Sequence, residues 1–225
     1  MEPKKFAWSY SALSAFETCP FQFAQLRIKK TVKEPPSTHL TWGIKVHDAF
    51  EKYMLGELNP VPKWFKPWIP IANVVRDTQG TVTPELEMAI TDKFQPTGWW
   101  DHDAWCRGKL DVTVDRGDTI HVFDWKTGKR RQNSEQLQLF AALAFIYYPK
   151  AQTVRTTFIW LDADAQDTET FTRSDIPDIW GNFLPRVARM QEALTLDQWP
   201  KRSSGLCANY CHVPTSMCAH SGKGG

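Results

Sequence analysis

Two strand-like runs, at residues 105–114 and 119–126, limit the possible folds of this chain more than any other feature. Asp115-Arg116-Gly117-Asp118, the stretch between them, consists of residue types that tolerate tight turns. We therefore expect the two runs to form an antiparallel hairpin.

The hairpin carries two carboxylates and a lysine. Asp111 lies on its first strand, and Asp124 and Lys126 lie on its second. If Val114 pairs with Thr119 across a four-residue loop, the two carboxylates are diagonal neighbours on one face. The Cα atoms of diagonal neighbours are about 7–8 Å apart. This separation would allow both carboxylates to bind one divalent cation.

Side chains alternate along a strand, so Asp124 and Lys126 should project together while Trp125 turns into the core. Hydrolysis of a phosphodiester requires neutralised phosphate charge and a nucleophilic hydroxide, and Mg²⁺ held by carboxylates can provide both. Lys126 would orient the water and stabilise the developing charge. Asp-X-Lys is also a common surface salt-bridge pattern, so the tripeptide alone assigns no site.

The other elements follow from hydrophobic periodicity and from cap and turn residues. We expect helices, three strands, a helix, a strand and a helix, in that order. The segments are two short helices with a bend between residues 9 and 28, a helix at 40–55, an irregular connection at 56–82, a strand near 85–90, the hairpin, a helix at 135–148 capped by Asn133, a strand at 153–161 and a helix at 176–196.

The chain has 225 residues, enough for one principal domain. Residues 1–200 should form it, because the character of the sequence changes to Gly, Ser, Cys and His in residues 201–225. No run of about 18 apolar residues predicts a membrane span. The first five residues also lack a secretory signal, so we expect a cytoplasmic protein.

The charge of +2 gives no overall positive field, so a nucleic-acid partner must be argued from local clusters. Two basic clusters suit a phosphate backbone or, alternatively, are solvated turns. They are Lys126 with Lys129, Arg130 and Arg131, and Arg27 with Lys29 and Lys30. Trp99-Trp100 or the segment 64–68 would stack unpaired bases or else pack in the core.

The stretch from Gly108 to Gly128 resembles the core of the PD-(D/E)XK nuclease superfamily, in its RecB-type branch. There a Gly-X-X-Asp strand precedes an Asp-X-Lys-Thr-Gly strand. The branch includes CRISPR adaptation nucleases, helicase-linked exonucleases and many phage proteins. Further stretches that resemble it are 10–16 with Cys19-Pro20, Gly43 to His47, 136–141 and the C-terminal cysteines. The resemblance implies an α/β fold with a restriction-endonuclease-like core, in which helices flank a central mixed β-sheet.

The resemblance also implies roles. Asp111 and Asp124 would be the central metal ligands, His47 an additional ligand, Lys126 the catalytic lysine, and Gln136 a contact to substrate or active-site water. Without that context, a lone histidine on an apolar helix is more often structural. The branch often has tyrosine where Phe140 stands. Glu85 or Glu87 would supply a further acidic group only by a loose match, and we leave both out of the predicted site.

Five cysteines, an odd number, favour reduced thiols or metal ligands over disulfides. Relatives in this branch hold a [4Fe-4S] cluster with one upstream and three C-terminal cysteines, which here are Cys19, Cys207, Cys211 and Cys218. The cluster would join residues 201–225 to Cys19. Each gap in the tail is one residue longer than in the best-known relatives. Zinc, with His212 or His220 as possible ligands, and free thiols remain alternatives, and Cys106 lies outside the set.

We therefore expect an enzyme, a Mg²⁺- or Mn²⁺-dependent DNA nuclease, and the resemblance favours an exonuclease with a role in repair or recombination. No phosphate-binding loop of an ATPase occurs, so a helicase or recombination protein would be the partner that unwinds DNA. The alternative is a DNA-binding subunit that keeps the fold and the cysteine site but does not cleave.

Overall fold

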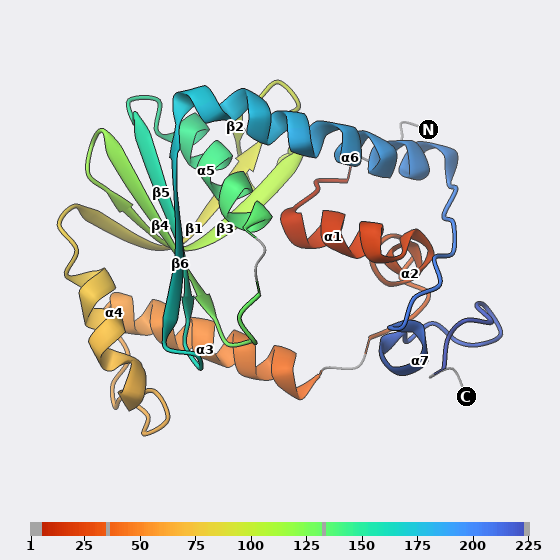
Figure 1. The fold of residues 1–225 in the computed structure, drawn as a ribbon, viewed down its shortest axis with the longest axis horizontal. Helices are drawn as coiled ribbons and strands as arrows, with labels where there is room; N and C mark the ends of the chain where they lie inside the picture. The colour runs from red at the N-terminus through yellow and green to blue at the C-terminus, as the bar shows by residue number, and fades with distance from the viewer. Residues whose placement is uncertain (1–5, 35–36, 132–133, 223–225) are drawn as a thin grey trace. The chain divides into compact units, whose positions relative to one another are not determined.

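The computed structural model describes residues 6–34, 37–131 and 134–222 (Figure 1). The described chain folds into two compact units. One, here called the sheet unit, contains residues 6–7 and 37–181, and the other, the cysteine unit, contains residues 8–34 and 182–222. The C-terminal segment thus belongs to the same unit as the N-terminal helices, and the boundary at residue 200 stays a prediction.

The sheet unit is built on six strands in the order β2-β1-β3-β4-β5-β6. All neighbours are antiparallel except β4 and β5, which run parallel and are joined through α5 (Glu135–Tyr147). The strands are β1 (Thr81–Ile90), β2 (Pro96–Thr97), β3 (Cys106–Asp115), β4 (Thr119–Lys126), β5 (Thr153–Trp160) and β6 (Ala165–Thr172). This mixed sheet flanked by helices confirms the predicted fold class.

Helices cover both faces of this sheet (Figure 1). Ile159 of β5 packs in one hydrophobic cluster with residues of α3 (Thr38–Met54) and α4 (Ile69–Arg76). Its neighbours Phe158 and Trp160 pack instead with Leu137 of α5. Successive strand residues point to opposite faces, so α3 and α4 lie on one face and α5 on the other.

The cysteine unit consists of helices and a C-terminal loop segment. Its helices are α1 (Tyr10–Thr18), α2 (Pro20–Phe23), a π-helical turn (Ala24–Ile28), the part of α6 (Ile176–Leu196) from residue 182 onward, and α7 (Cys207–Tyr210). Ser9 Oγ caps α1 by accepting from the backbone N–H of Ala12 at 3.3 Å. Both Glu17 oxygens accept from the Arg186 guanidinium at 2.7 Å, which ties α1 to α6 within this unit.

The structure bears out most of the predicted elements. The strand at 119–126 and the helix at 176–196 have the predicted bounds. The prediction of an irregular connection at 56–82 was wrong in part, because the segment contains α4. Pro70 is compatible with this helix because it lies in the first turn, where a missing N–H costs no helical hydrogen bond. The strands β2 and β6 were missed. The predicted cap Asn133 lies outside the described residues.

The predicted register of the hairpin was also wrong. Val114 pairs with His121, and not with Thr119, because β3 continues to Asp115. The chain reverses at Gly117 and Asp118, where Gly117 has a φ of 88°, a conformation that favours glycine. The shift is by two residues, so the register now sets position 111 opposite Asp124 rather than diagonal to it.

None of the helices in the described part of the chain is long and apolar enough to cross a membrane.

Candidate active site

The candidate site lies where β3 and β4 stop pairing. The registered pairs end at Val112 and Phe123. Beyond them, the backbone N–H of Trp125 donates to Asp111 Oδ2 at 2.8 Å, in a buried hydrogen bond. A side-chain carboxylate thus replaces the backbone acceptor of the neighbouring strand, which satisfies a buried N–H that would otherwise be costly.

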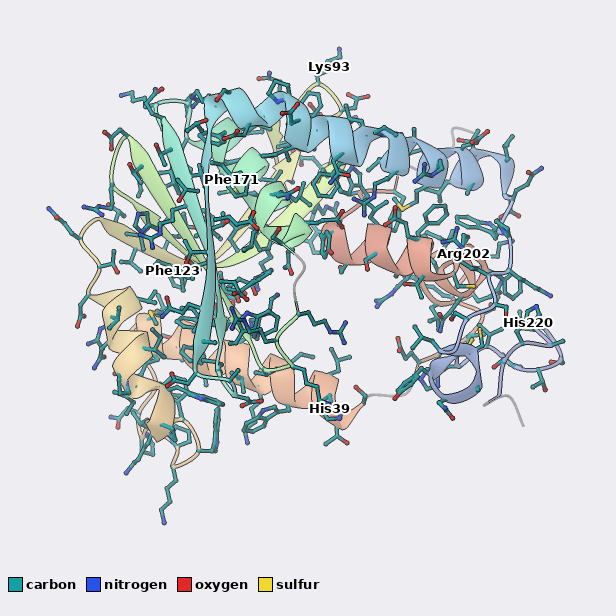
Figure 2. The ribbon with its side chains drawn as sticks, in the orientation of Figure 1. His39, Lys93, Phe123, Phe171, Arg202 and His220 are labelled. Carbon is teal, nitrogen blue, oxygen red and sulfur yellow. The ribbon has the colours of Figure 1, made fainter. Side chains whose placement is uncertain are left out.

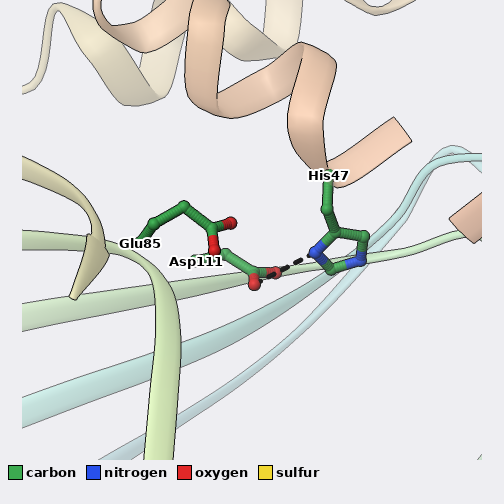
Figure 3. Close-up of side chains that lie close together, drawn as sticks. All are labelled: His47, Glu85 and Asp111. Atoms are coloured by element: carbon green, nitrogen blue, oxygen red, sulfur yellow. Dashed lines mark hydrogen bonds and ion pairs between the residues drawn. The ribbon is translucent and has the colours of Figure 1, made fainter. Parts of the chain in front are cut away.

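Asp111 gathers a first group of ligand-type side chains. His47 on α3 lies with its Nδ1 3.1 Å from Asp111 Oδ1 (Figure 3). Glu85 on β1 completes the group, because one ligand atom from each of these three residues lies within 4.8 Å of the others. The predicted residues His47 and Asp111 are therefore brought together from positions 64 residues apart.

Glu85 is the functional candidate that the sequence interpretation left out. It stands between the pairs Pro84–Val112 and Leu86–Leu110, so the register places it opposite Asp111. Its φ of 51° is left-handed, a conformation that costs an ordinary residue about 1–2 kcal/mol. Such strain concentrates at functional sites. An ion pair with Lys109 holds the carboxylate. The sequence offered Glu85 or Glu87 only by a loose match, and the pairing of β1 with β3 selects Glu85.

A second group is formed by Asp124, Lys126 and Gln136. Lys126 Nζ lies 2.5 Å from Asp124 Oδ2 and donates to Gln136 Oε1 at 2.9 Å. The Gln136 amide donates in turn to Asp124 Oδ1 at 3.2 Å. The three side chains thus form a closed triangle at the end of β4 and the start of α5. Trp125 turns away as expected and stacks on Phe50 with ring centroids 4.0 Å apart.

The charges of the two groups influence one another. Burial raises the pKa of Asp124 to about 6, and the charge of Asp111 acts in the same direction, although Lys126 opposes both. Burial lowers the pKa of His47, but the hydrogen bond to Asp111 and the nearby carboxylates raise it above its usual value. Burial also raises the pKa of Glu85, against the effect of Lys109. Burial thus works against the ionised form of Glu85 and Asp124, and Lys109 and Lys126 oppose this effect.

These residues fit a divalent cation. Among the described residues, Asp124 Oδ2 is buried without a hydrogen-bond partner, and its ion pair with Lys126 is what compensates it. Carboxylate oxygens suit Mg²⁺ and Mn²⁺, and imidazole is an accepted ligand for transition metals. His47, Glu85, Asp111 and Asp124 are the residues that could hold the ion.

The predicted thiol ligands lie in the cysteine unit. Cys19, Cys207, Cys211 and Cys218 line one pocket there. In Figure 2, sulfur atoms lie beside the C-terminal segment that carries Arg202 and His220. Cys211 and Cys218 pack in a small core with Val213, next to Phe21. Cys106 lies apart on β3, where burial raises the pKa of its thiol well above the usual value.

The spacing of these thiols bears on the metal they suit. Zinc–sulfur bonds of about 2.3 Å in a tetrahedron place thiolates roughly 3.8 Å apart. Among the described residues, no three cysteine sulfurs lie within 4.8 Å of one another. A [4Fe-4S] cluster requires wider spacing, because each thiolate binds a different iron. The four thiols share one pocket, as either the cluster or zinc would require.

Comparisons with known proteins give the following matches. A model of the PD-(D/E)XK nuclease superfamily matches residues 7–218. A solved structure from Eubacterium rectale, named "Putative exonuclease", aligns with a TM-score of 0.56 over 91% of this chain and 86% of that chain, at 12% identity. At this identity the likeness shows the fold alone. The structure of SSO0001 aligns over 97% of this chain and 86% of that chain at 14% identity, but its TM-score of 0.42 carries no argument. No curated protein matches the chain.

The raised pKa of Asp124 predicts how the stability of the metal-free protein depends on pH. Between the usual value of 3.8 and about 6, the folded state binds more protons than the unfolded state. The free energy of unfolding should therefore fall as the pH rises through this range. Asp124→Asn, which removes the charge, should be more stable than the native protein at neutral pH by on the order of 1–3 kcal/mol. The two should converge near pH ~4.

Urea unfolding in EDTA across this pH range measures the difference between the two proteins. An Asp124→Asn protein that is less stable than the native chain at neutral pH would contradict the conclusion that burial of the ionised Asp124 carboxylate costs more than its pair with Lys126 returns.

Proposed function

This chain belongs to the PD-(D/E)XK nuclease superfamily, and on that premise we propose that it is a divalent-metal-dependent deoxyribonuclease that digests DNA from its ends. One observation carries the proposal. Among the described residues, a buried carboxylate with no hydrogen bond on one oxygen, Asp124, is paired with Lys126 beside the cluster of His47, Glu85 and Asp111. This arrangement combines a place for a hard cation with a fixed positive charge.

His47, Glu85, Asp111 and Asp124 would hold Mg²⁺ or Mn²⁺. When bound, such an ion neutralises phosphate charge and lowers the pKa of water. The protein keeps these ligands in place before any metal arrives, because Trp125 N–H fixes Asp111 and Asp111 fixes His47. Ligands oriented in advance by neighbouring groups bind metal more tightly.

Lys126 would act on the phosphate. Its ammonium group is held by Asp124 and Gln136 and lies 4.6 Å from the centre of the Phe158 ring. A positioned ammonium in a partly buried site stabilises charge that develops on the phosphate oxygens in the transition state. Gln136 would keep the ammonium in place and face substrate or water.

The basic run after β4 would contact the DNA backbone. Arg130 is engaged in an ion pair with Asp167 of β6. Lys129 and Arg131 are exposed and are the residues of this run that we assign to phosphate contacts. The preference for DNA ends is supported by the resemblance to the RecB-type branch and by the name of the solved structure, "Putative exonuclease". A separate helicase or recombination protein would unwind duplex DNA.

Lys126→Ala should lower the cleavage rate by about 100- to 1000-fold, because a preorganised charge at the phosphate is lost. The measurement is digestion of end-labelled linear DNA and of covalently closed circular DNA with Mg²⁺, Mn²⁺ or EDTA. The native protein should degrade the linear DNA only with metal and spare the circle. Lys93→Ala, at an exposed lysine of the same unit, should match the native protein. Absence of cleavage by folded, metal-loaded protein would favour a DNA-holding subunit instead.

Glu85→Gln should weaken Mn²⁺ binding by about 10-fold or more, because it removes a charged ligand while keeping the shape of the side chain. Titration followed by the electron paramagnetic resonance signal of free Mn²⁺ measures this without any turnover. Glu87→Gln is the matched control, since Glu87 is exposed on the same strand and is not part of the cluster. Equal loss of affinity in both variants would remove Glu85 from the site.

We further propose that Cys19, Cys207, Cys211 and Cys218 hold a structural [4Fe-4S] cluster. Anaerobically purified protein should be brown, with broad visible absorbance and about four irons per chain. Cys211→Ala should lose the colour and the iron, whereas Cys106→Ala should keep both, because Cys106 lies on β3 away from the pocket. Zinc or metal-free thiols in protein purified under these conditions would contradict the cluster.

A further inference from the structure

The aromatic residues of the sheet unit are of two kinds. Trp64 and Trp68 pack against the core cluster that contains the fully buried Phe65. Trp100 is 82% exposed, more than any other large hydrophobic residue of the described chain. Of the two tryptophan segments singled out in the sequence, the structure therefore leaves only the one at Trp99-Trp100 available for a ligand.

A guanidinium lies beside Trp100. The guanidinium carbon of Arg107 is 5.5 Å from the ring centroid of Trp99 and 5.3 Å from that of Trp100. Among the described residues, none forms a hydrogen bond with the buried Arg107 Nε. Within the same part of the chain, no carboxylate forms an ion pair with Arg107. Because Nε is buried, the terminal amino groups of this guanidinium are the donors that would bind an anion such as a phosphate.

The loop that presents Trp100 is held in one shape by its own polar groups. Asp101 Oδ2 accepts from the Gly98 N–H at 2.8 Å and from Thr97 Oγ1 at 3.1 Å. Thr97 Oγ1 also lies 2.8 Å from Asp103 Oδ1. A Cβ added at Gly98 would lie 2.7 Å from Asp101 Oδ2, so glycine permits this close turn. Both acidic side chains are thus engaged within the loop, and a preorganised platform loses little entropy on binding.

Arg107, which lies beside Trp100, is further along β3 from the candidate active site. Lys109 forms an ion pair with Glu85, so the side chain of Lys109 points toward the metal-ligand cluster. Arg107 is two residues from Lys109 in a continuous register and therefore projects to the same side. Four residues of strand separate Arg107 from Asp111, a span of about 13 Å. Stacked nucleotides rise about 3.4 Å each, so about four nucleotides, or fewer when unstacked, cover that span.

We propose that Trp100 and Arg107 form a subsite that stacks one unpaired base of the DNA strand and binds its phosphate, about four nucleotides or fewer from the bond that is cleaved. The subsite rests on the proposed nuclease function and deepens it, because it names a single-stranded DNA segment as the form that enters the site. A base pair inside a duplex is covered on both faces by its neighbours and cannot offer a face to an indole ring.

The first test measures binding alone, in EDTA, by the fluorescence anisotropy of a labelled single strand of about twelve nucleotides. Trp100→Ala should raise the dissociation constant about 5- to 30-fold, and Trp100→Phe, which keeps a stacking ring, should recover most of the affinity. Val74→Ala, at another exposed apolar side chain of the sheet unit, should leave it unchanged. Equal affinities of the native protein and Trp100→Ala would overturn the subsite. So would an equal effect of Trp100→Ala on a blunt duplex.

The second test locates the stacked base. A series of strands, each with one abasic position, should reveal a position at which the native protein binds weakly. The affinity of Trp100→Ala should not change when the base at that position is removed, because the indole that would stack on this base is already absent. If every abasic position weakens both proteins equally, the stacking assignment is wrong. If Trp100 contributes to binding but no Lys126-dependent cleavage occurs, the subsite is retained and the nuclease function is rejected. If cleavage occurs but Trp100→Ala has no effect on binding, the nuclease function is retained and the subsite is rejected.

Discussion

The hydrogen bond from Trp125 N–H to Asp111 Oδ2 is the interaction on which the rest of the site depends. It joins β3 and β4 beyond their last registered pair and leaves the other carboxylate oxygen for His47. Because the bond fixes the backbone at Trp125, the indole is directed into the core against Phe50, and Asp124 is directed to the opposite face. One buried carboxylate therefore connects β3, β4 and α3 at the site.

Charge is distributed unevenly around this bond. On one side of the bond, His47, Glu85 and Asp111 each place a ligand-type atom within 4.8 Å of the others. On the other side, the carboxylate of Asp124 forms an ion pair with Lys126. Burial disfavours ionised carboxylates, and the raised pKa of Asp124 reflects that cost. The strained backbone at Glu85 adds to this cost, and the hydrogen bonds of Gln136 with Lys126 and Asp124 offset part of it. A site that is destabilised when empty gains stability from a cation, and this is the arrangement expected of a metal-dependent hydrolase.

The two units separate two kinds of chemistry. The oxygen and imidazole ligands lie in the sheet unit, and the four thiols that share a pocket lie in the cysteine unit. Hard oxygen ligands and soft thiolates select different metals, so the separation allows both kinds of metal in one chain without competition. The sheet unit also contains the exposed Trp100, whose setting differs from the packed tryptophans of the same unit. The proposed active site and the proposed base-stacking subsite thus belong to the same unit.

The sequence by itself determined the features that depend on neighbouring residues. Alternation along residues 119–126 placed Asp124 beside Lys126 with Trp125 facing the core, and the periodicity of residues 176–196 gave a helix. Only the tertiary structure decided what depends on distant pairing. Glu85, which lies on β1 opposite Asp111, could not be chosen over Glu87 from the sequence, because a register between separate strands is fixed by packing and turn geometry. The polar edge strand β6 buries few side chains and has no hydrophobic alternation to announce it. The tight turn at Gly117-Asp118 shifted the hairpin by two residues, which preserved the shared face of the two aspartates because the side-chain period of a strand is two.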